Sequence, residues 1–331
     1  MIISRTPFRV SFFGGGTDYP AWFQEHGGAV LATTIDKYCY ISVRLLPPFF
    51  DHRFRLVYSV VENVKEISEI QHPAVRAVLQ WNGNNKGLEI HHDGDLPARS
   101  GLGSSSAFTV GLINAVKALE GRLISKEELA KSAIHIEQCV IREPVGSQDQ
   151  ISAAFGGFNR IEFMANGTFD LTPIVLPKEK LEWLEQHLML VFTGISRYSN
   201  EVARTKIENL RNRTAELKTM REMVDHALDI LRSPTTSILE FGKLLHEGWL
   251  LKKRLSDQVS NSRIDEIYEV ARHTGAVGGK VLGAGGGGFV LLFVEPPNHA
   301  AVKQSLKDFI HVPFRFESSG SRLVLYQPNG L

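Results

Sequence analysis

The chain has 331 residues, which is long enough for two hydrophobic cores, since single cores stop growing near ~250 to 300 residues. An apolar fraction of 43% and a charged fraction of 22% are ordinary for a globular protein and exclude extensive disorder. The 37 Lys and Arg residues balance 36 Asp and Glu, so no global field draws the protein to nucleic acid or to a membrane. We expect a small-molecule partner, with no nucleic acid and no membrane.

The N-terminus and the cysteines indicate a cytoplasmic protein. Residues 1–10 lack the basic start and apolar run of a secretory signal peptide, and no stretch approaches ~18 apolar residues. Cys39 and Cys139 stand in apolar stretches, and we interpret both as buried, reduced thiols. Either a monomer or a homodimer is compatible with the sequence.

The first third of the chain is rich in β-branched and aromatic residues, which predicts the strands of one sheet. These runs are 10–13, 29–46, 53–60 and 87–92. A Gly- and Ser-rich stretch then follows at 97–108. It leads at once into apolar residues at helical spacing, so we interpret it as a loop that opens a helix over 104–119 rather than as a linker.

Two further helices and a strand are expected before residue 165. Ser125 followed by Glu128 has the form of a capping box at the start of a helix that runs to about residue 141. A short helix over 147–155 is closed by Gly156 and Gly157, and residues 158–164 return to a strand.

Strands and helices alternate from about residue 180 onward, which predicts a second α+β sandwich. We place the boundary near 175–187 and divide the chain into an N-terminal domain, 1–180, and a C-terminal domain, 181–331. The expected elements are strands at 187–194, 314–319 and 322–327 and helices at 200–231, 236–255, 262–275 and 299–310. A glycine-rich stretch at 278–294 lies among them and becomes strand-like from Phe289 onward.

Three glycine-rich stretches, 12–20, 100–107 and 282–289, are candidate phosphate loops. The third contains a literal G-x-G-x-x-G, but it runs into a strand-like segment and two prolines rather than into a helix, which excludes a dinucleotide fingerprint. In the second, Gly101 and Gly103 allow close backbone approach beside a helix N-terminus, which suits a nucleotide. A tight packing turn remains the alternative.

Two carboxylates add to this pattern. Glu137 shares a helix face with Ala130 and Ile134, where a carboxylate is costly unless it meets a cation. Asp149 begins the short helix among small residues, a position suited to a buried, hydrogen-bonded acid. The alternatives are a partly exposed helix residue for Glu137 and a first-turn cap for Asp149.

Taken together, these residues resemble the GHMP kinase superfamily. Its first, second and third motifs match residues 6–19, 96–108 and 280–293 in order, with Glu137 and the segment 146–150 in between. The resemblance covers nearly the whole chain. It implies a two-domain α+β kinase, with an N-terminal domain like domain 2 of ribosomal protein S5 and a C-terminal ferredoxin-like sandwich, that uses ATP and Mg²⁺.

The resemblance also implies roles for individual residues. Asp149 matches the catalytic base and Arg9 the arginine beside it, while Ser105 and Glu137 match the magnesium ligands. Gly15, Gly16, Thr17 and Asp18 match the acceptor loop. The residues that match the ATP loop and its closing segment are Arg99, Ser100, Gly101, Leu102, Gly103, Ser104, Ser105, Ser106, Gly285 and Gly286.

The acceptor loop departs from that of the galactokinases, which carry Glu-His at the positions of Gly15 and Gly16. The sugar contacts of those two side chains cannot form here, which argues against galactose as the acceptor. Segments 14–23, 146–163, 192–202 and 278–289 are most similar to bacterial D-glycero-D-manno-heptose 7-phosphate kinases, which phosphorylate the anomeric hydroxyl to give the 1,7-bisphosphate on the route to GDP-heptose. The alternatives are another sugar-1-kinase, fucokinase-like or galactokinase-like, and a non-catalytic sugar and ATP sensor. Basic candidates for the distal phosphate are Arg99, Arg197 and Lys280.

Overall fold

The computed structural model describes residues 1–84, 86–195, 205, 207 and 209–328. Its larger sheet is built on two long antiparallel strands, β1 and β2, and has the order β13–β1–β2–β5–β3–β4, with β6 and β12 also paired to β2 and β7 paired to β6. The bounds are β1 (Ile2–Phe13), β2 (Gly28–Leu45), β3 (Phe54–Val57), β4 (Val61–Val64), β5 (Leu88–Gly94), β6 (Phe158–Phe163), β7 (Phe169–Pro173), β12 (Phe316–Glu317) and β13 (Arg322–Tyr326).

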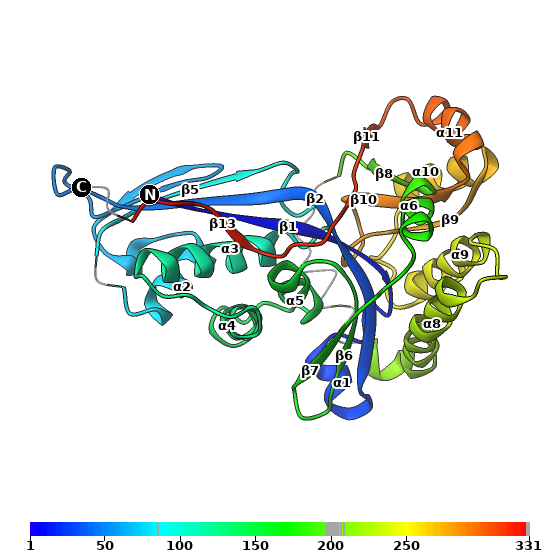
Figure 1. Ribbon diagram of the computed structural model, residues 1–331, viewed down its shortest axis with the longest axis horizontal. Helices are drawn as coiled ribbons and strands as arrows, with labels where there is room; N and C mark the ends of the chain where they lie inside the picture. Colours follow the sequence, from blue (N-terminus) through cyan, green and yellow to red (C-terminus); the bar gives the residue numbers. More distant parts are fainter. Residues whose placement is uncertain (85, 196–204, 206, 208, 329–331) are drawn as a thin grey trace.

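Helices α2 to α5 lie together on one face of this sheet (Figure 1). The central one, α3, is buried along almost its whole length, because its side chains are apolar or small on every side. It has the bounds that the spacing predicted. The helical segments of this part are α1 (Pro20–His26), η1 (Ile67–Glu69), α2 (Pro73–Trp81), α3 (Ser104–Leu119), α4 (Lys126–His135), η2 (Ile136–Val140) and α5 (Gln148–Phe155).

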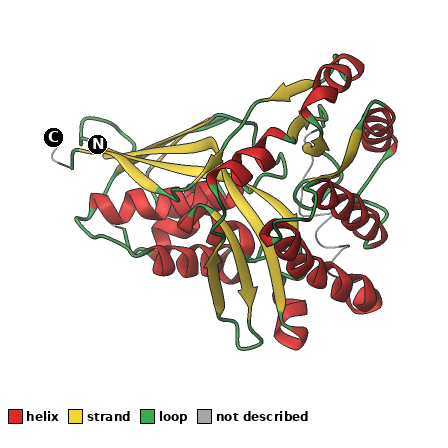
Figure 2. Ribbon diagram, turned by 45° about the vertical axis from the view of Figure 1, so that its right-hand side comes forward, coloured by secondary structure: helices red, strands yellow, loops and turns green. Residues whose placement is uncertain are grey.

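A smaller sheet, in the order β11–β8–β10–β9, forms the second unit with helices α8 to α11 around it (Figure 2). Every residue of β10 is buried, which explains why its sequence is a continuous apolar run. The bounds are α6 (Lys178–Gln186), β8 (Leu188–Phe192), η3 (Leu210–Arg213), α8 (Thr214–Arg232), α9 (Leu239–Arg254), α10 (Ser262–His273), β9 (Ala276–Val281), β10 (Phe289–Val294), η4 (Pro296–Asn298), α11 (His299–Ser305) and β11 (Ile310–Val312).

The last two strands return to the first sheet, which the sequence did not indicate. Their place in the chain predicted that they belong to the second sandwich, but β13 pairs with the free edge of β1 and β12 pairs with β2. The two ends of the chain therefore lie side by side (Figure 1), and the Gln327 amide donates to the Met1 carbonyl at 2.9 Å. The pairing covers an edge that would otherwise expose unpaired backbone groups.

Three local predictions were confirmed where the chain is described. Ser125 Oγ accepts a hydrogen bond from the Glu128 amide at 3.2 Å and caps α4. The short helix before Gly156 is α5, and the third glycine stretch ends in β10, not in a helix. Of the helix expected over 200–231, residues 200–204, 206 and 208 lie outside the described residues. No helix of the described part is long and apolar enough to cross a membrane.

The prediction for one cysteine was wrong. Cys39 is buried, as expected, but Cys139 is exposed. It lies in η2, a π-helical turn that follows α4, whose buried residues are Ile136 and Glu137. The widened turn directs the side chains of residues 139 and 140 outward, so the apolar neighbours of Cys139 in sequence do not enclose it.

Candidate active site

Arg9 and Asp149 form the centre of the candidate site. Arg9 lies on β1 and is 4% exposed; its Nε and Nη2 donate to the two carboxylate oxygens of Asp149 at 2.7 and 2.8 Å. Its third nitrogen, Nη1, donates to the Gly101 carbonyl at 2.7 Å, and its backbone amide donates to the Leu102 carbonyl at 3.0 Å. One arginine thus holds both the carboxylate and the glycine loop in a fixed relation.

The second glycine stretch forms a compact loop before α3. Arg99, Gly101 and Gly103 all have positive φ, at 59°, 82° and 75°, and Gly103 is the N-cap of α3. Ser104 Oγ accepts from the Arg99 amide at 3.1 Å and closes the loop. Alternation of left-handed residues turns successive N–H groups toward one side, an arrangement that binds anions, and the positive end of α3 adds to it.

The second and third glycine stretches are in direct contact. A Cβ atom on Gly101 would lie 2.5 Å from the Leu282 carbonyl oxygen, and one on Gly288 would lie 2.2 Å from the Ser100 carbonyl oxygen. The Phe289 amide donates to that same Ser100 oxygen at 3.1 Å. Glycine is therefore required for close approach here, and the segment containing Gly285 and Gly286 borders the candidate ATP loop.

Glu137 is buried beside the start of α3, with 1% exposure. Ser106 Oγ donates to its Oε2 at 2.8 Å and Gln150 Nε2 donates to the same oxygen at 2.5 Å. Its other oxygen, Oε1, is buried without a hydrogen-bond partner among the described residues. Burial raises the pKa of this carboxyl to about 7, although the nearby polar side chains of Thr109, Ser106 and Gln150 oppose the shift.

The donor set around Glu137 fits a divalent cation. An unpaired buried carboxylate oxygen next to serine hydroxyls offers the hard oxygen ligands that Mg²⁺ prefers. Three serines, residues 104–106, open α3. Ser106 contacts Glu137, whereas Ser105 is exposed at the first turn of the helix. The π-helical turn that carries Glu137 is itself a feature that occurs frequently at functional sites.

The acceptor loop expected at residues 15–18 is a rigid turn after β1. Thr17 Oγ1 bridges the carbonyls of Gly14 and Ala29 at 2.8 and 3.0 Å. Asp18 is 2% exposed; its Oδ1 accepts from the Gly16 amide and its Oδ2 from Gln148 Nε2, both at 2.9 Å. Gln148 precedes Asp149, so the acceptor loop and the candidate base are joined through the first turn of α5.

The basic candidates for a distal phosphate are placed differently. Lys280 is 6% exposed, and its Nζ donates to the Phe12 carbonyl at 2.7 Å, which links β9 to the end of β1. Arg99 is exposed on the second glycine loop. Arg197 lies outside the described residues.

Three contacts of the site were not foreseen. Lys252, on α9, is 3% exposed and its Nζ donates to the carbonyls of Val281 and Gly283 at 2.6 and 2.7 Å, so it anchors the third glycine stretch. Gln148 and Gln150 hold the two carboxylates described above. Segment 146–150 was matched to the kinase family as a unit, but its local sequence pattern does not predict which residue each glutamine contacts.

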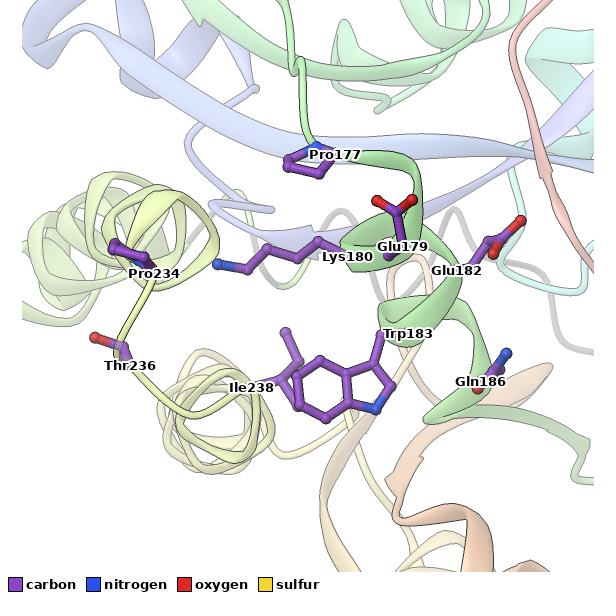
Figure 3. A pocket seen from close by; sticks show the side chains of 9 residues that line it. All are labelled: Pro177, Glu179, Lys180, Glu182, Trp183, Gln186, Pro234, Thr236 and Ile238. Carbon is purple, nitrogen blue, oxygen red and sulfur yellow. The ribbon is translucent and has the colours of Figure 1, made fainter.

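Two of the grooves in the described part differ in their relation to the site. One, of about 450 Å³, lies between α6 and the loop after α8 (Figure 3), where Lys180 points toward that loop and donates to the Ser233 carbonyl at 2.5 Å. None of the candidate site residues lines it. The other, of about 600 Å³, includes Pro97 and Phe289 and borders the two glycine stretches.

Comparison with known proteins defines the class. The GHMP kinase N-terminal domain matches residues 56–157 and the GHMP kinase C-terminal domain matches residues 227–310. The D-glycero-alpha-D-manno-heptose 7-phosphate kinase of Campylobacter jejuni is 30% identical over 308 residues, covering 89% of this chain and 90% of its own. The chain therefore belongs to the GHMP kinases and is a phosphotransferase with an alcohol group as acceptor. The phosphoryl donor of this family is ATP.

Further relatives agree with this assignment. The bifunctional fucokinase/GDP-fucose pyrophosphorylase of Arabidopsis thaliana is 25% identical and covers 91% of this chain, which spans 31% of that longer protein. A crystal structure of a D-glycero-D-manno-heptose 1-phosphate kinase from Bacteroides thetaiotaomicron has a TM-score of 0.80 at 24% identity, covering 98% of this chain and 99% of its own. The predicted two-domain α+β kinase fold is confirmed.

Proposed function

We propose that this protein is an ATP- and Mg²⁺-dependent sugar kinase that phosphorylates the anomeric hydroxyl of D-glycero-D-manno-heptose 7-phosphate and yields the 1,7-bisphosphate. The observation that carries the proposal is the Arg9–Asp149 ion pair, held against the second glycine loop and joined through Gln148 to Asp18. A base, a phosphate loop and an acceptor loop within one network suit phosphoryl transfer to a sugar.

In the proposed reaction, the anomeric oxygen attacks the γ-phosphorus of ATP, the bond from that phosphorus to the β,γ-bridging oxygen breaks, and ADP leaves. Asp149 accepts the hydroxyl proton. Arg9 keeps both carboxylate oxygens in place, and the amides of residues 100–106 stabilise charge on the phosphoryl oxygens. Ser105 and Glu137 would hold Mg²⁺, which when bound offsets phosphate charge. Asp18, Gly15, Gly16 and Thr17 position the sugar.

Two relatives support a sugar as the acceptor. The Campylobacter jejuni protein is named for heptose 7-phosphate, and the Arabidopsis thaliana protein for fucose. The first is more similar, at 30% against 25% identity, and this chain spans 90% of it against 31% of the second, which favours heptose 7-phosphate. The second makes an L-fucokinase-like activity the runner-up. Gly15 and Gly16 have no side chain, so only their backbone can contact a sugar at these positions, unlike the Glu-His pair of the galactokinases.

The remaining assignments complete the proposal. The N-terminal domain spans 1–180 and the C-terminal domain 181–331, with β12 and β13 pairing across that division. Arg99, Arg197 and Lys280 are the candidates for the distal phosphate. The protein acts in the cytoplasm as a monomer or homodimer.

The test is ADP release measured with heptose 7-phosphate, fucose, galactose and mannose as acceptors. We expect the highest kcat/KM with heptose 7-phosphate and a product whose new phosphate couples to the anomeric proton in a ³¹P spectrum. Preference for fucose would transfer the assignment to the runner-up. If none of the four acceptors raises ADP release above the hydrolytic background, the result would contradict a sugar kinase and favour a sensor.

A further inference from the structure

The first turn of α5 brings three consecutive side chains to three different parts of the site. Asp149 pairs with Arg9, Gln148 Nε2 donates to Asp18 Oδ2 at 2.9 Å, and Gln150 Nε2 donates to Glu137 Oε2 at 2.5 Å. Successive residues of a helix diverge by ~100° around its axis, so one turn can reach the acceptor loop, the arginine and the buried glutamate at once.

Both glutamines are buried in a way that stability alone does not explain. Gln148 is 8% exposed and Gln150 is fully buried. Each has an amide oxygen without a hydrogen-bond partner among the described residues. An unpaired buried amide oxygen destabilises the folded protein, whereas methionine would fill a similar volume without that cost. The gain must therefore lie in what the amide nitrogens hold.

The two amide nitrogens fix the orientation of the carboxylates that they contact. Asp18 accepts from the Gly16 amide on one oxygen and from Gln148 on the other, so its plane is set. Glu137 accepts from Ser106 and Gln150 on Oε2 alone, which leaves Oε1 unpaired. A hydrogen-bond donor suits these places, because a carboxylate would repel its partner and a methyl group would remove one of the hydrogen bonds that orient it.

We propose that Gln148 and Gln150 are positioning residues with separate duties: Gln148 orients Asp18 toward the acceptor, and Gln150 orients Glu137 toward the metal. The inference rests on the proposed function for the roles of Asp18 and Glu137. It makes the first turn of α5 the part that aligns the acceptor, the base and the metal carboxylate with one another. In this proposal each glutamine acts through the carboxylate that it contacts.

The test uses Gln148→Met and Gln150→Met in the full-length protein and two measurements. The first is Mn²⁺ affinity by electron paramagnetic resonance in the presence of a non-hydrolysable ATP analogue. The second is the KM for whichever acceptor of the panel supports turnover. Removing a group that orients a metal ligand costs 10- to 100-fold in affinity. We expect Gln150→Met to weaken Mn²⁺ binding about tenfold with acceptor KM unchanged, and Gln148→Met to raise acceptor KM about tenfold with Mn²⁺ affinity unchanged.

A matched control tests for nonspecific effects of removing a buried amide, and a second pair of variants covers the case in which a methionine variant does not fold. Asn114, on α3, is a buried amide with the same 8% exposure as Gln148. Its Nδ2 donates to Ser321 Oγ at 3.1 Å and not to either carboxylate, so Asn114→Leu should change neither measurement. If a methionine variant does not fold, Gln148→Asn and Gln150→Asn, which keep the amide but shorten its reach, are expected to give the same crossed pattern.

The outcomes separate this inference from the substrate assignment. Equal losses in both measurements for both variants would indicate a merely structural role and overturn the inference, as would no change in either. The Mn²⁺ titration requires no turnover. Suppose that Gln150→Met loses Mn²⁺ affinity and that the wild-type protein is inactive on heptose 7-phosphate. The first result would support the positioning role, and the second would overturn the proposed substrate.

Discussion

Arg9 and Asp149, 140 positions apart in the sequence, meet in a two-point ion pair in which Nε and Nη2 of the arginine each donate to one carboxylate oxygen, at 2.7 and 2.8 Å. The arginine is buried while the aspartate side chain keeps 26% exposure. The carboxylate is thus held from the protein side and open on the other, as a proton acceptor for a bound hydroxyl must be.

Asp149→Asn should lower kcat by ~10² to 10⁴ and leave nucleotide affinity close to that of the wild type, because the change removes the proton acceptor but not the glycine loop. Steady-state ADP release and binding of a fluorescent ATP analogue measure the two effects. Asp225→Asn, on α8 with a 47% exposed side chain, serves as the control with wild-type kcat. Near wild-type kcat in Asp149→Asn at saturating substrates would show that the base is another group.

Arg9→Lys should lower kcat and destabilise the protein by about 2 kcal/mol, because an ammonium group cannot make two parallel bonds to Asp149 and a third to the Gly101 carbonyl. Urea denaturation gives the free energy of unfolding. Arg160→Lys, in an ion-pair network with Glu162 and Asp225, should cost less than about 1 kcal/mol. Equal losses for the two arginines would contradict a special role for the Arg9 contacts.

Gly101→Ala should destabilise the protein and raise the KM for ATP, because a Cβ would lie 2.5 Å from the Leu282 oxygen at a φ of 82°. Gly121 is the matched control: its φ is 75°, but nothing lies within 4 Å of its Cβ position. Gly121→Ala therefore bears only the left-handed strain of ~1 to 2 kcal/mol. The difference in unfolding free energy between the two variants measures the contact between the glycine stretches, and no difference would argue against it.

Glu137 should make the stability of the metal-free protein depend on pH. Its pKa is raised from 4.5 to about 7 by burial. In the unfolded chain Glu137 ionises above pH 4.5, while in the folded protein it keeps its proton until about pH 7, so its own contribution to stability is greatest below pH 4.5 and is lost as the pH rises through 7. The loss is on the order of 3 kcal/mol.

Glu137→Gln tests this dependence, because it removes the ionisation. Denaturation in EDTA at pH 5 and pH 8 should show the wild type losing stability relative to the variant as the pH rises. A constant difference between the two proteins would contradict the raised pKa. At neutral pH the variant should also need more Mg²⁺ for half-maximal ADP release.

Lys252→Met should raise the KM for ATP severalfold and lower the Tm, because the buried ammonium donates to the carbonyls of Val281 and Gly283 at the start of the third glycine stretch. Without it, these carbonyls lose their donor. Lys243→Met removes a 60% exposed lysine of the same helix, which forms a surface ion pair with Glu240 at 2.7 Å, and should be neutral. If Lys252→Met lowers the Tm but leaves the KM for ATP unchanged, the contact is structural only.

The sequence by itself determined the features that depend on residues close together in the chain. Helix α3 follows from apolar spacing, the cap of α4 from Ser125, and the loop before α3 from Gly101 and Gly103, because these preferences act within one or two turns of chain. The order of three glycine stretches with Glu137 and Asp149 between them was enough to indicate the kinase family.

The tertiary structure decided which distant groups meet. No local rule joins Arg9 to Asp149 or Gln150 to Glu137, because ion pairs and buried hydrogen bonds form only after packing brings the elements together. The same holds for β13, whose pattern says strand but whose partner, β1, is the edge that the finished sheet leaves open. Cys139 shows the converse: its apolar neighbours predicted burial, and the π-helical turn exposes it.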